Sequence, residues 1–156
     1  MKIKIVPTEP RCGDCTMCCQ TVGFTGDWKI TDLYNEAEKF DIDFGPWETC
    51  NKLCDTGCSI QENKPRVCKE FFCQFIERNL SEKHHPKNTG FVTFRDGLPL
   101  DSRIIIHSND KTLPPDVQHK NNKELLNDML DELQDKLGQE RLFAQLSTKK
   151  GKIRIR

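Results

Sequence analysis

The chain has 156 residues, of which 35% are apolar and 31% charged, and its formal net charge is zero. This length fits one domain with a thin hydrophobic core, to which a bound metal would add stability. Zero net charge excludes the global basic field that drives nonspecific nucleic-acid binding.

The compartment and the redox state follow from the N-terminal composition and the cysteine count. The chain shows no signal-peptide pattern and no segment near the roughly 20 apolar residues of a membrane span. We therefore expect a cytoplasmic protein without membrane contact. Thiols stay reduced there, and nine cysteines are an odd number, so metal ligation is favoured over a disulfide-stabilised domain.

Short elements are expected around the cysteines in the first half of the chain. Residues 2–6 alternate basic and apolar side chains, which is typical of a half-buried strand. Thr31 can cap a short helix that reaches Phe40. Pro65 suits the first position of another helix, whose apolar spacing continues to Ile76.

The cysteines fall into two blocks. The first block is Cys12, Cys15, Cys18 and Cys19, and the second is Cys50, Cys54, Cys58, Cys68 and Cys73. In a helix, the first four thiols would lie within about a third of the circumference. In an irregular loop, C-x2-C spacing also brings two sulfurs together. Both conformations therefore stay open. The neighbours Cys18 and Cys19 would strain one tetrahedral ion, which favours two ions or a bridging thiolate.

Together the two blocks resemble the CxxCxxCC family of zinc- or iron-chelating cysteine-cluster proteins. Cys12, Cys15, Cys18 and Cys19 match the motif that names this family. Its second signature, C…GC-x-I-Y-x-x-R-P-x-x-C-R-x-F-x-C, is met in register by Cys50, Gly57, Cys58, Ile60, Pro65, Cys68, Phe71 and Cys73. Gln61, Lys64 and Lys69 depart from that signature without removing a thiol, and Cys54 resembles an additional cysteine of some members.

The resemblance implies a metal-binding protein that chelates zinc or iron through a multi-cysteine cluster, as a structural or metal-handling module. All-thiolate ligation suits zinc or an iron–sulfur cluster, and the spacing does not separate them. Metal ions are thus the expected partners, beside a protein partner that the sequence does not identify. Flagellin lysine methylases are similar to this family, which implies an alternative: an iron–sulfur-dependent enzyme that transfers methyl groups to protein lysine. The chain shows no recognisable methyl-donor site, so the sequence does not decide whether the protein is an enzyme.

The second half begins with a polar connector and two strands. His84-His85-Pro86 is interpreted as the connector, with a Cys/His ligand role as the alternative. Residues 91–94 and 103–106 predict strands around a tight turn at Asp96-Gly97. Residues 112–118, with two consecutive prolines, are expected to form a loop.

An amphipathic helix and a basic tail complete the chain. The helix ends near Gly138, and its apolar stripe consists of Leu125, Leu126, Met129, Leu130, Leu133 and Leu137. Residues 149–156 resemble an edge strand with charged outer positions. Nucleic-acid contact is not expected there, because no aromatic residue is interleaved with the basic ones.

The expected fold is a small α+β domain over residues 1–156, stabilised by metal. It combines short helices, a β-hairpin and a C-terminal amphipathic helix. Residues 10–80 form its cysteine-cluster half, and residues 81–156 form a strand-strand-helix half that packs beside it.

Overall fold

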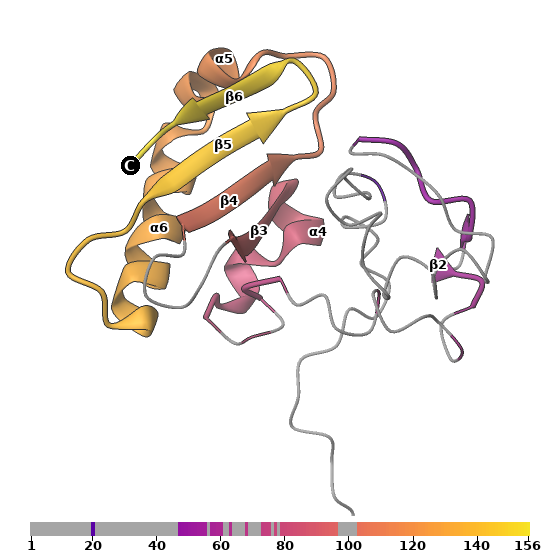
Figure 1. Ribbon diagram of the computed structural model, residues 1–156, viewed down its shortest axis with the longest axis horizontal. Coiled ribbons are helices and arrows are strands. Elements are labelled where there is room, and N and C mark those ends of the chain that lie inside the picture. The colour runs from indigo at the N-terminus through magenta and orange to yellow at the C-terminus, as the bar shows by residue number, and fades with distance from the viewer. Residues whose placement is uncertain are drawn as a thin grey trace, which may run out of the picture.

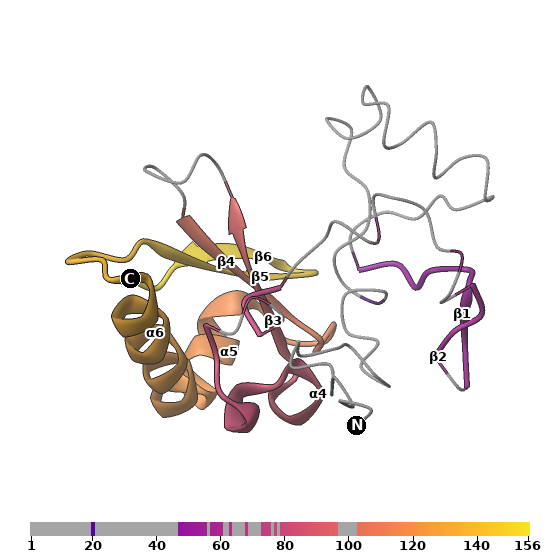
Figure 2. The same cartoon turned by 90° about the horizontal axis from the view of Figure 1, so that it is seen from below.

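The main feature of the chain is a four-stranded sheet with its helices on one face (Figures 1 and 2). The computed structural model describes residues 20, 47–55, 57–60, 63, 68, 73–75, 77, 79–96 and 103–156. The combination of helices with a mixed sheet confirms the predicted α+β class. No helix within the described ranges is long and apolar enough to cross a bilayer.

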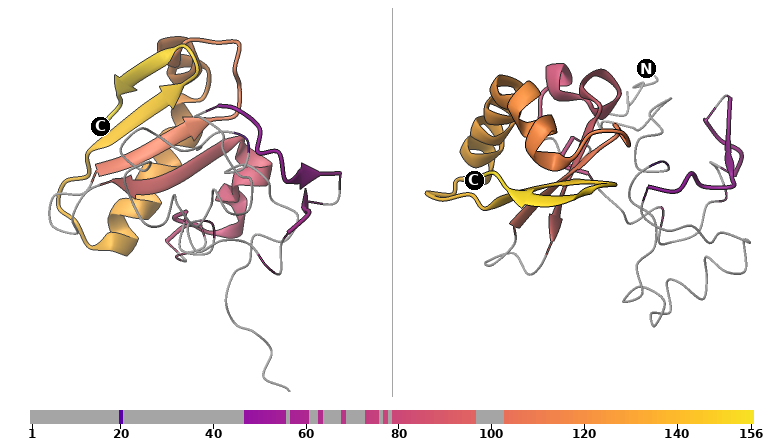
Figure 3. Two further views of the ribbon diagram at one scale, coloured as in Figure 1. Left: turned by 45° about the vertical axis from the view of Figure 1, so that its right-hand side comes forward. Right: turned by 90° about the horizontal axis from the view of Figure 1, so that it is seen from above.

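The strands of the sheet lie side by side in chain order: β3 (Phe91–Asp96), β4 (Arg103–Ser108), β5 (Ala144–Thr148) and β6 (Gly151–Arg154). Strands β3 and β4 are antiparallel, as are β5 and β6, whereas β4 and β5 are parallel. Parallel neighbours need a crossover connection. Helices α5 (Pro115–Asn121) and α6 (Lys123–Leu137) form this crossover, and both lie on the same side of the sheet (Figure 3).

Helix α6 covers the sheet with an apolar stripe, as its sequence predicts. The spacing of three and four residues places one face toward the core. Its buried residues are Leu126, Met129, Leu130 and Leu133. The helix ends in the two bonds of a Schellman motif, from Gly138 N–H to Asp135 and from Gln139 N–H to Gln134, each 3.2 Å long. Gly138 has a φ of 61°, which a glycine adopts without strain.

The sheet meets this stripe with small and branched side chains. The register pairs Ile104 with Ala144 and Ile106 with Leu146, so these four residues share one face. All four belong to the hydrophobic cluster that contains the α6 stripe. Strands β3 and β4 confirm the predicted strand pair, and their length follows from β-branched and aromatic residues that favour extended backbone.

The helix α5 corrects the prediction of a loop over residues 112–118. The proline pair does not break the structure here, because Pro115 stands at the first helical position, where no N–H is needed. Strand β5 was not expected from the sequence, whereas β6 confirms the edge strand predicted in the basic tail.

The segment before β3 corrects two further predictions. Residues 73–75 are not helical, although a helix was expected to reach Ile76; instead Gln74 N–H donates to the carbonyl of Thr93 at 2.8 Å. The supposed polar connector forms the short helices η2 (Glu82–His84) and α4 (Pro86–Thr89). Both of its histidines are buried. The predicted strand at 2–6 and helix at 31–40 lie outside the described residues.

Leu130→Ala should reduce the free energy of unfolding by about 2–5 kcal/mol, because the change leaves a cavity where a fully buried side chain packs against the sheet. Urea unfolding followed by circular dichroism measures this loss. Glu124→Ala on the exposed side of the same helix is the control and should leave stability nearly unchanged. Equal losses for both variants would contradict the assigned core face of α6.

Candidate functional site

Three cysteines of the second block lie on and beside a small hairpin. Strands β1 (Leu53–Cys54) and β2 (Gly57–Cys58) pair antiparallel, with Leu53 opposite Cys58 and Cys54 opposite Gly57. Residues directly opposite each other share a face, and neighbours along a strand do not. Cys58 therefore lies on the Leu53 face of the hairpin, and Cys54 lies on the other. This explains why Cys54 is exposed while Cys58 is partly buried.

Cys50 lies in the turn that leads into this hairpin. Its carbonyl accepts a hydrogen bond from Leu53 N–H at 3.1 Å, which closes the turn. Its Sγ accepts a hydrogen bond from Lys52 N–H at 3.4 Å and lies 4.0 Å from the side-chain oxygen of Asn51. A backbone N–H directed at sulfur stabilises negative charge on it, as hydrogen bonds around a metal-bound ligand do. Because Cys50 is buried, a thiolate here would lose hydration, and the Lys52 N–H would offset part of that cost.

Both ends of the described cysteine segment attach to the sheet. Before Cys50, the indole of Trp47 stacks on His107 at a centroid distance of 4.6 Å, and its Nε1 donates to the carbonyl of Ser108 at 3.3 Å. Trp47 has a φ of 61°, an unfavourable value for a non-glycine residue that its packing on the sheet must offset. After the hairpin, buried Cys73 joins the core cluster of the sheet.

The structure thus describes five of the nine predicted ligands: Cys50, Cys54, Cys58, Cys68 and Cys73. No two of these five are joined by a disulfide bond. Within the described residues, no three Cys, His, Asp or Glu side chains are grouped closely enough to hold a metal ion. The other four predicted ligands, Cys12, Cys15, Cys18 and Cys19, lie outside the described residues.

A histidine clamp, which the sequence did not predict, joins η2 to α6. His84 is only 1% exposed, and its Nδ1 lies 2.5 Å from Glu132 while its Nε2 lies 2.9 Å from Asp128. Each ring nitrogen faces a carboxylate oxygen, so an N–H at either position has an acceptor. Glu132 also accepts hydrogen bonds from the backbone N–H and the hydroxyl of Ser81, which begins η2. The clamp occupies both nitrogens of His84, so neither is directed at a cysteine.

His85 also has a structural place. Its Nδ1 accepts a hydrogen bond from Lys87 N–H at 3.0 Å and so caps α4. Its ring packs edge-on against Phe75 with centroids 4.2 Å apart. The described contacts of the two histidines therefore favour packing over the alternative Cys/His ligand role.

A surface ion pair extends the clamp into solvent. Lys83 Nζ lies 2.8 Å from Asp128, and the side chains are 62% and 55% exposed. The hydrogen bond from Lys83, with a smaller contribution from His84, lowers the pKa of the Asp128 carboxyl. The same bond raises the pKa of Lys83. Both shifts favour the charged pair at neutral pH.

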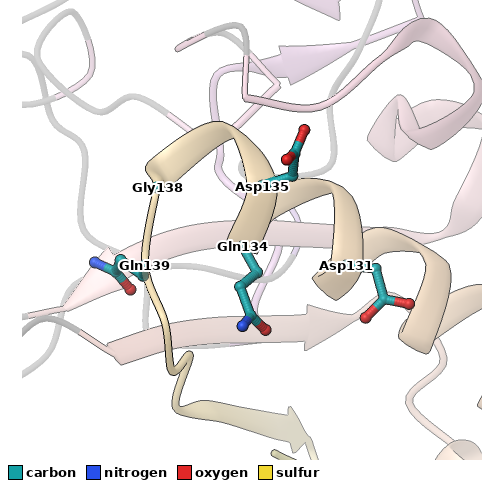
Figure 4. Close-up of a pocket in the computed structure, with 5 residues that line it drawn as sticks. All are labelled: Asp131, Gln134, Asp135, Gly138 and Gln139. Carbon is teal, nitrogen blue, oxygen red and sulfur yellow. The ribbon is translucent and has the colours of Figure 1, made fainter.

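A shallow pocket of about 430 Å³ lies at the end of α6 (Figure 4). Its lining residues are Asp131, Gln134, Asp135, Gly138 and Gln139. In Figure 4 the Asp135 side chain points away from that of Gln134. Arg156 pairs with Asp131 at 2.8 Å and donates to Gln134 at 3.4 Å, so two of the polar groups are already partnered. We therefore assign no ligand to this pocket.

Comparison of the chain with protein-family models, with curated proteins and with solved structures finds no match in any of the three. The resemblance to the CxxCxxCC family accordingly stays a prediction, and the chemistry of the chain rests on its own residues.

His84→Ala should lower the free energy of unfolding by about 1–3 kcal/mol, because it removes the contacts of a buried ring with both Asp128 and Glu132. Urea unfolding of the variant and of the wild type at neutral pH measures the difference. Lys83→Ala removes only an exposed side chain of the group and should cost much less. A loss as large for Lys83→Ala would show that the buried histidine is not the centre of the clamp.

Stability should depend on Asp128 in acid. Because its pKa is lower in the folded than in the unfolded chain, its contribution is present above the ordinary carboxyl pKa and is lost as the pH falls through the lowered value. Asp128→Asn should therefore be less stable than wild type at neutral pH, with the difference vanishing in strong acid. Added salt should shrink the difference, since the pair is exposed. An unchanged difference across the acid range would contradict this assignment.

Proposed function

We propose that the chain is a metal-binding module that holds zinc or iron through its cysteine thiolates. The observation that carries the proposal is the buried Cys50 Sγ, which accepts the N–H of Lys52 in the turn before a hairpin that bears Cys58. Sulfur is a weak acceptor. The backbone donor directed at this sulfur would stabilise a metal-bound thiolate, whereas burial alone favours the neutral thiol.

The donor set fits this group of metals. Thiolate ligands suit zinc and iron–sulfur clusters, whereas magnesium and calcium take oxygen ligands. Such a centre would join segments distant in sequence, and the binding free energy would become part of the folding free energy. That contribution would matter here, because Cys50 is the one buried residue among those whose burial the structure describes between 47 and 60.

The hairpin distinguishes the second-block cysteines. Cys50 is buried and Cys58 is partly buried, while Cys54 is exposed and lies on the opposite face of the hairpin from Cys58. We therefore propose Cys50 and Cys58 as ligands from the hairpin, completed by Cys68, Cys73 and the first block. Cys54 falls outside this set.

Elemental analysis of the full chain purified without oxygen tests the proposal. Wild type should contain zinc or iron in fixed proportion to protein, and Cys50→Ser should contain clearly less. Cys54→Ser is the matched control, since it removes a thiol from the same hairpin and should retain the full metal content. Absorbance near 400 nm, if present, would identify the metal as an iron–sulfur cluster.

Removal of the metal gives an independent measurement. A chelator should reduce the circular dichroism signal and lower the thermal midpoint of the chain, because ligation contributes to folding. The absence of stoichiometric metal, or a chelated protein with unchanged signal and midpoint, would refute a structural metal centre.

A further inference from the structure

The face of the sheet opposite the helices carries the basic residues of the last two strands. Leu146 on β5 pairs with Ile153 on β6, and both pack in or against the core. Side chains alternate along a strand, so the flanking pairs, Gln145 with Arg154 and Ser147 with Lys152, lie on the other face. Figures 2 and 3 show α4, α5 and α6 all on the core side.

An aromatic ring lies beside these cations. Phe143 is 49% exposed and is the one large apolar side chain classed as exposed within the described part of the chain. The guanidinium of Arg154 lies over its ring, 4.9 Å from the centroid. Arg154 Nε also donates to the carbonyl of Arg156 at 3.0 Å, which holds the guanidinium in place. The ring and the cation thus form an ordered pair at the surface.

The C-terminal segment is basic and helix α6 is acidic, although the whole chain is neutral. Residues 141–156 contain no Asp or Glu and six basic residues, namely Arg141, Lys149, Lys150, Lys152, Arg154 and Arg156. Helix α6, on the core side, carries five acidic residues, Glu124, Asp128, Asp131, Glu132 and Asp135, against Lys123 and Lys136. Arg156 pairs with Asp131 of α6, whereas Lys152 and Arg154 lie on the strand side, so an anionic partner would be attracted to that side and repelled from the helix side.

We propose that this face, formed by Phe143, Gln145, Lys152 and Arg154, binds single-stranded nucleic acid. Bases stack on exposed aromatic rings and on Arg guanidinium planes, while nearby cations bind the phosphates. An acidic peptide would use the cations but would leave Phe143 unexplained. A duplex would need an element that enters a groove, and the short strands β5 and β6 present none.

The proposal departs from the expectation drawn from the sequence alone. That expectation rested on the lack of aromatic residues among the basic ones in the tail. Phe143 precedes β5, eleven residues before Arg154, and only the pairing of β5 with β6 brings the two side chains together.

Fluorescence anisotropy with a labelled single-stranded oligonucleotide, in DNA and RNA forms, tests the proposal on the full chain. Wild type should bind with an affinity that falls as salt rises. Phe143→Ala should weaken binding by about fivefold to a hundredfold, the range for loss of one stacked base. Phe143→Trp, which keeps a stacking surface, should bind at least as tightly as wild type.

The charge variants separate this face from a general electrostatic effect. Lys152→Gln with Arg154→Gln should weaken binding and reduce the slope of log affinity against log salt by about 0.7 for each lost phosphate contact. Lys123→Gln with Lys136→Gln makes the same charge change on α6 and should alter neither. Unchanged circular dichroism and thermal midpoint would exclude loss of fold.

Four results would overturn the proposal. These are no binding of either oligonucleotide, equal effects of the two charge double variants, tighter binding of the corresponding duplex, and displacement by polyglutamate as effective as displacement by unlabelled oligonucleotide. The last result would assign the face to an acidic protein segment instead.

Discussion

Burial of the apolar stripe of α6 against one face of the sheet is the constraint on which the rest of the structure depends. The stripe needs a wide apolar surface, and Ile104, Ile106, Ala144 and Leu146 form it only when β4 and β5 lie side by side. That parallel pairing requires the crossover through α5 and α6. Because α4, α5 and α6 then lie on one face, the other face carries Gln145, Lys152 and Arg154 on β5 and β6, while Trp47 packs over His107 on β4.

Polar interactions position the chain that leads into this core. His84 joins η2 to α6 by facing two carboxylates that are one helical turn apart on α6, Asp128 and Glu132. Gln74 bonds to the backbone of β3, and Trp47 packs on β4, so both described ends of the cysteine segment are attached to the sheet. A metal in this segment would thus act on a frame whose attachment points are already set.

The two proposals concern different parts of one molecule and different physical forces. Metal ligation would compensate for the small amount of apolar surface that the described residues between 47 and 60 bury, because bonds to sulfur would stabilise the segment instead. The basic face of β5 and β6 lies on the well-packed half, where its ordered Phe143–Arg154 pair does not depend on the cysteines. A metal-free variant that still binds an oligonucleotide would be consistent with this separation.

The sequence by itself determined the elements whose signal is local. The stripe of α6, the β-branched runs of β3 and β4, the alternating tail and the two cysteine blocks all follow from periodicity or spacing within a few residues. Only the tertiary structure decided which distant residues meet. It buried His84 and His85, which look like a polar connector, because the carboxylates that satisfy His84 lie about forty-five residues away in the sequence. It also made a strand of Ala144–Thr148, placed Phe143 beside Arg154 and turned Cys54 away from Cys58, since strand register and pairing are long-range choices that no local pattern contains.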